Sequence, residues 1–338
     1  MGRSPEDLAI FIGRRLIQLI PVLFGVIVLT FLVTHIATIN PCPRWYPKGH
    51  QAILNCEANL SQPLLTQFLH YFLPFLQGNW GASELGTPVF PQIVQDVPAT
   101  VELVLAALFL MVVIGIPLGV IAAQYAGRWP DHLVRIFYLS GWASPTFVLS
   151  IIVAVYVARP IGLNSGDFSV LNPPFHQWTH MSVVDALLAG NLSYTVDALS
   201  HLAFPAGVIA FINMGIATRM TRTSMLEVLP LDYVKSARMK GLSNFTVLFR
   251  HALRNSLITT TTVLGVEVGG LLASTVVIEE VFGWPGIGQY AYNSFGAAGQ
   301  PNFDGAIAVV VVFAIGVVIS NLIADILYGV LDPRVEWR

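Results

Sequence analysis

The run TVELVLAALFLMVVIGIPLGVIAA, from Thr100 to Ala123, indicates the fold class, because Glu102 is its only charged residue. A helix needs about 20 mostly apolar residues to cross the hydrocarbon core of a bilayer, since each residue advances it by about 1.5 Å. A transmembrane strand needs only about 10 residues and alternates apolar with polar positions, which this run does not do. The run therefore predicts a membrane-spanning helix.

Five further runs of the same kind lie on either side of it. In chain order they cover about Leu16 to Ala37, Ile136 to Ala158, Ala198 to Thr218, Ser256 to Ile278 and Gly305 to Tyr328. Pro117 and Pro145 predict kinks in the second and third of the six spans. The chain is 55% hydrophobic and 11% charged, whereas a soluble domain is about 25% charged. We therefore expect an all-α polytopic membrane protein with six transmembrane helices.

The positively charged residues predict the topology, because Lys and Arg resist translocation and stay in the cytoplasm. With the N-terminus inside, the outer segments hold only Arg44, Lys48 and Arg159 of the 17 Lys and Arg. We expect both termini to be cytoplasmic, in a multi-pass protein of the cell (plasma or inner) membrane. The predicted parts are a cytoplasmic N-terminus with the first helix (1–37), an outer loop (38–99), a five-helix core (100–330) with an inner loop at 219–255, and a cytoplasmic tail (331–338).

Candidate ligand-binding residues in the outer loops are few. Cys42 and Cys56 both lie in the first outer loop, where a disulfide between them and two free thiols are equally open. His176 and His180 have the i, i+4 spacing of a helical metal site. They stand beside two prolines with no third ligand near, so we predict no metal site. The chain has no basic tract interleaved with aromatic residues, so nucleic acid is not an expected partner.

The stretch between the fourth and fifth spans, Arg219 to Asn255, has the pattern of a short helix between two breaks. We expect Asp232 to cap a helix from about Tyr233 to Lys240, and Gly241 to end it. Beyond it, we expect Ser243 to cap an amphipathic helix that leads into the fifth span. A short helix with small and basic residues, held away from the bilayer, suits insertion into a groove of a partner. The alternative is a basic loop that only fixes the topology.

The segment DYVKSARMKGL, from Asp232 to Leu242, resembles the coupling loop of the permease subunits of binding-protein-dependent ABC importers. In that family the loop reads Glu-Ala-Ala, three residues, Gly, nine residues, Ile-x-Leu-Pro. Here Lys235, Ser236 and Ala237 fill the triplet, while Gly241 and Leu253 fill the glycine and leucine positions. The chain departs from this pattern at four positions. Lys235 replaces Glu, Ser236 replaces Ala, His251 replaces Ile and Arg254 replaces Pro.

Three other stretches resemble the dipeptide/oligopeptide branch of this family in particular. They are RRLIQLIPVLFG (14–25), EVFGWPGIG (280–288) and DILYGVLDPR (325–334), and they lie in order along nearly the whole chain. The chain departs from the branch after the first span, where residues 40–48 replace a Gly-Asp-Pro element. It also departs at Glu267, where the branch more often has a neutral polar residue.

The resemblance implies the type I ABC importer permease fold. It also implies a role as one of two transmembrane subunits of an ATP-driven importer. The solute would be a di- or oligopeptide or, alternatively, an oligosaccharide or a metal chelate. ATP and Mg²⁺ would be bound by two separate ATP-binding subunits, or by one two-domain chain. This chain would then bind no cofactor itself and would not be an enzyme. A second homologous permease subunit and an extracytoplasmic solute-binding protein are the other implied partners, besides the lipid bilayer.

The resemblance assigns the coupling to the ATP-binding subunit to one group of residues. They are Asp232, Tyr233, Lys235, Ser236, Ala237, Arg238, Lys240, Gly241 and Leu242. The sequence has no Gly-x4-Gly-Lys-Ser/Thr loop, so it lacks the phosphate cradle of a P-loop ATPase. The energy for transport would therefore come from the partner.

Glu267, in the middle of the fifth span, is the sharpest candidate for lining a translocation pathway. A carboxylate at that depth is costly unless it faces water or a partner, although a structural Glu bonded between helices is an equal alternative. Its neighbours Gly265 and Gly269 are expected to permit close helix approach. Thr262 is a further candidate. Asn213 is a weaker one, for which an interhelical hydrogen bond is the favoured role.

Two alternatives of other classes remain open at this stage. A secondary transporter driven by an ion gradient would favour internal repeats, and the last three spans do not repeat the first three. The second alternative is a membrane scaffold or receptor that docks a cytosolic partner. An intramembrane enzyme is not expected, because no His-Glu-x-x-His or nucleophile motif is present. For the segment Trp284–Gly286, an aromatic turn at the membrane interface is the plain alternative to a functional role.

Overall fold

The structure, a computed structural model, describes residues 5–37, 62–82, 87–163, 173, 175–297 and 302–331. Across these residues the regular structure is helical, with one isolated bridge between Ala82 and Pro88. Five stretches are long and apolar enough to cross a membrane, namely Gly13–Leu32, Val89–Gln124, Leu192–Val228, Thr246–Phe282 and Asp304–Ile326. A bent pair, Trp129–Ala143 with Thr146–Ile161, is the sixth when counted as one span. Five of the six predicted spans are thus present as apolar helices, and the sixth is present if the bent pair crosses the membrane as one span.

The elements that build the spans follow one another along the chain. They are α1 (Pro5–Ala37), α5 (Val89–Leu110) continued by α6 (Ile116–Gln124), α7 (Trp129–Ala143) with α8 (Thr146–Val153), α10 (Leu192–Val228), α12 (Leu253–Phe282) and α14 (Phe303–Leu331). Shorter helices are α4 (Leu64–Leu76), α9 (Ser182–Leu188), α11 (Asp232–Met239) and α13 (Ile287–Tyr292). Short π-helical turns lie at Met111–Gly115, Ala154–Ala158, Thr246–Ala252 and Asn293–Ala297, and a 3-10 turn lies at Arg159–Ile161.

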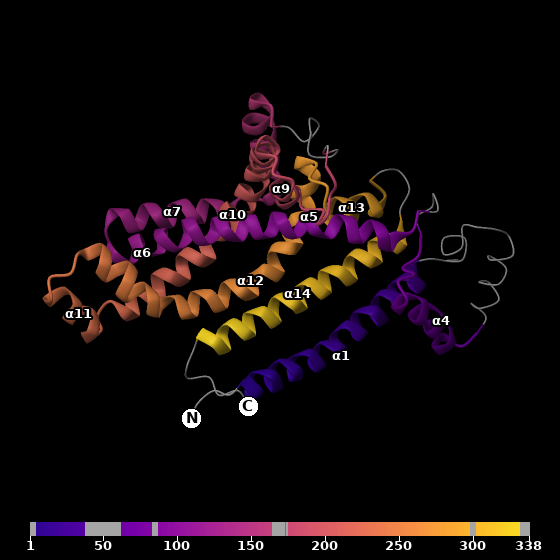
Figure 1. The fold of residues 1–338 in the computed structure, drawn as a ribbon, viewed down its shortest axis with the longest axis horizontal. Helices are drawn as coiled ribbons and strands as arrows, with labels where there is room; N and C mark the ends of the chain where they lie inside the picture. Colours follow the sequence, from indigo (N-terminus) through magenta and orange to yellow (C-terminus); the bar gives the residue numbers. More distant parts are fainter. Residues whose placement is uncertain are drawn as a thin grey trace.

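The bundle has two distinct ends (Figure 1). The helix α11 lies at one end, α13 and α4 lie toward the opposite end, and α9 lies above α5 on the same side of α11 as α13. The N-terminal end of α1 and the C-terminal end of α14 point toward the α11 end. This arrangement agrees with the predicted grouping of both termini with the inner loop on one side. That this side is the cytoplasmic one stays a prediction, and we call it the inner end below.

Proline shapes two of the spans in different ways. The third span turns by 100° between α7 and α8. Ser144 is extended there, with ψ 127°, because a residue before proline is pushed out of the helical region. The predicted kink at Pro145 is confirmed. In the second span, the π-helical turn Met111–Gly115 precedes Pro117. Such a turn accommodates the missing N–H without ending the helix.

Small residues let the spans approach closely, as predicted for Gly265 and Gly269. A Cβ on Gly265 would lie 2.7 Å from the Cβ of Ala324, and one on Gly269 would lie 3.3 Å from Val317, both on α14. Between α6 and α10, a Cβ on Gly119 would lie 2.6 Å from the Cβ of Thr221. Because lipid supplies no hydrophobic drive between helices, such close packing is what holds membrane helices together.

The helix α4 was not expected from the sequence. Its 13 residues are too few to cross a bilayer. It packs on α1 through edge-to-face ring contacts, with Phe68 and Phe72 each 5.9 Å from Phe24 and Phe68 5.3 Å from Phe31. On its other side α1 packs on α14, where Arg15 and Asp325 form an ion pair of 3.1 Å. The first span is thus attached to the rest through α14 and α4.

The interpretation of Trp284–Gly286 as an aromatic interface turn is wrong. The Trp284 side chain is 1% exposed, and its Nε1 donates a hydrogen bond to the carbonyl oxygen of Ala99 at 2.9 Å. The indole therefore packs inside the protein and ties the segment after α12 to α5.

Candidate functional site

The short helix at the inner end, α11, is held by one of its faces. Val234 is fully buried and Ala237 is 6% exposed. They pack with Val247, Leu248 and other residues at the inner ends of the neighbouring helices. At the start of α12, Asn255 Nδ2 donates a hydrogen bond of 2.8 Å to Tyr233 Oη. The helix is therefore fixed in position relative to the spans.

The ends of α11 follow the prediction in part. Gly241 has φ +78° and follows Lys240, the C-cap residue of α11, as expected of a residue that ends a helix in the left-handed region. Ser243 Oγ accepts a hydrogen bond from the backbone N–H of Thr246 at 3.3 Å, as predicted. The prediction that Asp232 caps α11 is wrong. Leu231 occupies the cap position, and the Asp232 carboxylate instead pairs with Lys235 Nζ at 3.0 Å.

The opposite face of α11 and the turn after it are exposed. Met239 is 81% exposed, Phe245 70% and Leu242 41%. The basic side chains Lys235, Arg238 and Lys240 and the small Ser236 are exposed around them. Large apolar groups ringed by polar ones mark protein contact surfaces. We call this set, from Tyr233 to Phe245, the inner docking surface.

A buried ion pair at the same end was missed by the sequence analysis. Asp131, in the first turn of α7, is fully buried. Arg222 of α10 donates to both of its carboxylate oxygens at 2.8 Å, one bond from Nε and one from Nη2. The N–H of Gly127 donates to the same carboxylate at 2.9 Å. The sequence did hold one signal for this pair: Asp131 is an acidic residue in a basic segment next to a predicted span.

The three pathway candidates do not converge on one point of contact. Glu267, on α12, is half-buried, and no hydrogen bond or ion pair joins its carboxylate to another described residue. Thr262 Oγ1 donates to the carbonyl oxygen of Ile258 at 3.0 Å, within α12. Asn213 Nδ2 donates to the carbonyl oxygen of Ile209 at 2.8 Å. The bond of Asn213 thus lies within α10 rather than between helices, contrary to the favoured role.

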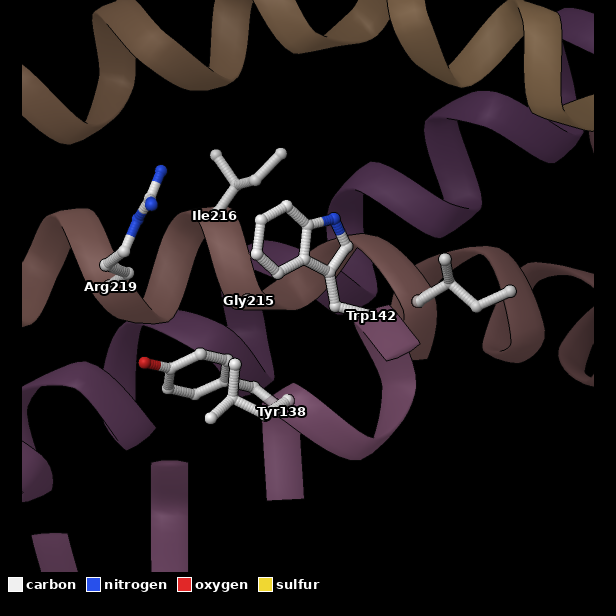
Figure 2. Close-up of a pocket in the computed structure, with 7 residues that line it drawn as sticks. Tyr138, Trp142, Gly215, Ile216 and Arg219 are labelled. Atoms are coloured by element: carbon white, nitrogen blue, oxygen red, sulfur yellow. The ribbon is translucent and has the colours of Figure 1, made fainter. Parts of the chain in front are cut away.

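A small pocket lies between α7 and α10 (Figure 2). Its volume is about 100 Å³. Its lining residues are Tyr138, Leu139, Trp142, Ile212, Gly215, Ile216 and Arg219. In the part of the chain that the structure covers, the guanidinium of Arg219 meets no carboxylate in an ion pair, and its side chain is exposed. The pocket therefore offers an aromatic and apolar surface next to one free positive charge. From the sequence, Arg219 was expected only as the first residue of the inner loop.

The predicted outer-loop ligands have different outcomes. Cys42 and Cys56 lie outside the described residues. His176 stacks edge-to-face on Trp178 at 5.6 Å, and His180 has φ 57°. No group of three or more His, Cys, Asp or Glu side chains in the described ranges is arranged to hold a metal ion.

Comparison with known proteins places the chain in a sequence family. Residues 115–337 match the family described as "Binding-protein-dependent transport system inner membrane component". The chain is 39% identical to the probable D,D-dipeptide transport system permease protein DdpB of Escherichia coli (strain K12), over 95% of this chain and 96% of that protein. It is 37% identical to the di/tripeptide transport system permease protein DppB of Pseudomonas aeruginosa (strain UCBPP-PA14), over 97% and 99%.

A solved structure has the same fold. A chain of the inward-facing MetNI methionine ABC transporter superposes with a TM-score of 0.52 at 16% sequence identity. The superposition covers 71% of this chain and 96% of that one. The predicted ABC importer permease fold is confirmed.

Proposed function

Since the chain belongs to the family of binding-protein-dependent transport system inner membrane components, we propose that it conducts peptides through the membrane in an ATP-driven importer. Members of this family form the membrane part of ABC importers, and separate subunits hydrolyse ATP. Family membership therefore removes the secondary transporter and the scaffold from consideration. The two relatives reported above carry dipeptide or di/tripeptide transport in their names, which supports di- and oligopeptides as the solute class.

The inner docking surface is the single observation on which the coupling mechanism rests. One face of α11 is buried against the spans, while Met239, Leu242 and Phe245 are exposed. A rigidly held helix with an exposed apolar and basic face fits a groove of a soluble partner. The proposed occupant is an ATP-binding subunit. Two such subunits, or one two-domain chain, would serve this chain and a second homologous permease. A solute-binding protein would deliver peptide at the outer end.

The attachment of α11 to the spans suggests how ATP binding would change the state of the pathway. When ATP draws the ATP-binding subunits together, a displacement of α11 passes to the spans, because Val234 and Ala237 are packed among them. Packed interfaces have discrete arrangements, so this shift selects one of two states. The pathway would open outward to receive the peptide and inward after hydrolysis.

Substituting Met239→Glu tests the docking proposal. The side chain is 81% exposed, so the new charge should leave the fold unchanged while burying an unpaired carboxylate at the interface. We expect co-purification of the ATP-binding subunit and peptide uptake to fall by about tenfold or more. Thr223→Glu is the matched control, because Thr223 is exposed on α10 at the same end. Normal co-purification and uptake by Met239→Glu would reject the docking surface.

A charged residue in mid-span supports a charged solute. Glu267 on α12 lacks an ion-pair partner among the described residues, and an intramembrane carboxylate of this kind defaults to a functional role. It would meet the ammonium end of a peptide. A neutral oligosaccharide has no such charge.

Glu267→Gln therefore tests both the residue and the solute class. In the assembled importer, with ATP hydrolysis as the check of assembly, we expect peptide uptake to fall by about tenfold. Unchanged uptake would show that Glu267 is structural. The solute class is tested by competition against uptake of a labelled dipeptide. If an oligosaccharide or a metal chelate inhibits this uptake and unlabelled peptide does not, the peptide assignment is wrong.

A further inference from the structure

One turn of α5, Ala99 to Glu102, is bonded to both short helices at the outer end. The carboxylate of Glu102 accepts hydrogen bonds from the backbone N–H groups of Ser182 and Val183, both at 2.8 Å. These are the first residues of α9. Glu102 is 6% exposed, so the two bonds are shielded from water.

The same turn fastens α13 through Thr100. The Thr100 hydroxyl accepts a hydrogen bond from the N–H of Ile287 at 2.8 Å and donates one to Glu279 Oε1 at 2.7 Å. Glu279 Oε2 in turn accepts from the N–H groups of Gly288 and Gln289, at 2.7 and 3.1 Å. Thr100 and Glu279 are both fully buried. Every one of these bonds joins segments that are distant in sequence or lie across the turn after α12.

Two glycines make room for this carboxylate. A Cβ on Gly288 would lie 2.8 Å from Glu279 Oε2 and 2.7 Å from the Cα of Val276. A Cβ on Gly286 would overlap Glu279 Oε2 and would lie 2.5 Å from Thr100 Oγ1. The segment Gly286–Gly288 is therefore shaped around Glu279. The Trp284 indole bonds the carbonyl oxygen of Ala99 as a further tie.

We propose that Thr100, Glu102 and Glu279 are positioning residues that couple the outer segments α9 and α13 to the spans during import. They join α9 and α13 to α5 and α12, so the outer segments move with the spans and do not fold in or out as independent loops. Arrival of the loaded binding protein at the outer end would then be transmitted to the spans, and onward to the ATP-binding subunits. This inference rests on the proposed import function and adds the residues that connect the outer end to it.

The isosteric change Thr100→Val tests the proposal in the complete importer with its binding protein. It removes the donor to Glu279 and the acceptor for Ile287 while keeping the side-chain volume. We expect amide hydrogen exchange at Ile287 to quicken by about tenfold, because its buried N–H loses its partner. We expect peptide uptake to fall by about tenfold. ATP hydrolysis should persist but should lose its stimulation by the loaded binding protein. Thr100→Ser, which keeps the hydroxyl, should restore all three.

Glu280→Gln is the matched control, because Glu280 is the next residue on α12 and is only half-buried. It should leave exchange, uptake and stimulation unchanged. Glu102→Gln is the second variant, should Thr100→Val fail to assemble. It should quicken exchange at residues 182–183 and reduce the stimulation. Faster exchange with normal uptake and normal stimulation would overturn the positioning role and leave the import function intact. Unchanged exchange in Thr100→Val would overturn it as well.

Discussion

Asp131 and Arg222 hold the inner ends of α7 and α10 together through two hydrogen bonds of 2.8 Å. The Asp131 carboxylate is fully buried, whereas the Arg222 side chain is 23% exposed. Removing one member of a buried pair leaves the other charge without compensation, which costs more than the pair itself contributes. The stability of the inner end should therefore depend on keeping both charges or neither.

The variant Asp131→Asn should lower the free energy of unfolding by about 3 kcal/mol. The double variant Asp131→Leu with Arg222→Met should recover part of that loss, because both members of the pair are removed, while Arg135, whose Nε lies 3.4 Å from Asp131 Oδ1, keeps its charge there. Thermal unfolding of the purified protein in detergent measures both. Asp325→Asn is the control, since its pair with Arg15 is partly exposed and should contribute less than about 1 kcal/mol. A double variant as unstable as the single one would contradict the electrostatic explanation.

At the interface between α12 and α14, the two helices pack so closely that added side-chain volume should disturb them. A Cβ on Gly265 would lie 2.7 Å from Ala324 Cβ and 2.9 Å from its Cα. Gly265→Ala should therefore destabilise the protein by about 1–3 kcal/mol, as overpacking does. Adding Ala324→Gly should restore part of the loss, because it removes one of the two clashing atoms.

Thermal unfolding of the single and double variants checks this, with Gly207→Ala as the control. Nothing lies within 4 Å of a Cβ at Gly207 on α10, so that change should be neutral. If Gly265→Ala is also neutral, the two helices are not packed as closely as the structure places them.

The sequence predicted elements well where one physical rule dominates. Apolar length gave the spans, and Gly241 gave the end of α11. Contacts between residues that are distant in the sequence could not be predicted from it. Nothing in a linear pattern says that Glu279 will meet Thr100, from which it is separated by 179 positions. For the same reason Trp284 was read as an interface residue, although it is buried against α5.

The position of α11 was predictable from the sequence, but its capping was not. The caps and the glycine placed α11 within one residue at each end. Asp232 is nevertheless outside the cap position, because Leu231 adopts the extended conformation there with ψ 148°. The helix α4 was missed because its 13 mostly apolar residues satisfy neither the length of a span nor the polarity of a loop.

On the scale of the molecule, long continuous helices connect the two ends. The helix α10 has 37 residues, which corresponds to about 55 Å at about 1.5 Å per residue. It begins near the outer helix α9 and ends next to α11 (Figure 1). A shift at the inner docking surface can thus reach the outer end as a rigid-body movement, with no chain of local rearrangements.

The most direct measurement of the central claim is site-directed cross-linking of the intact importer in native membranes. A cysteine is introduced as Met239→Cys on α11, and another as Leu187→Cys on α9, where Leu187 is 58% exposed. The account predicts that the cysteine at 239 cross-links to an ATP-binding subunit and is shielded from a membrane-impermeant thiol reagent added outside. It predicts that the cysteine at 187 reacts with that reagent and forms no such cross-link. Labelling of position 239 from outside, or its failure to cross-link to any ATP-binding subunit, would contradict the account.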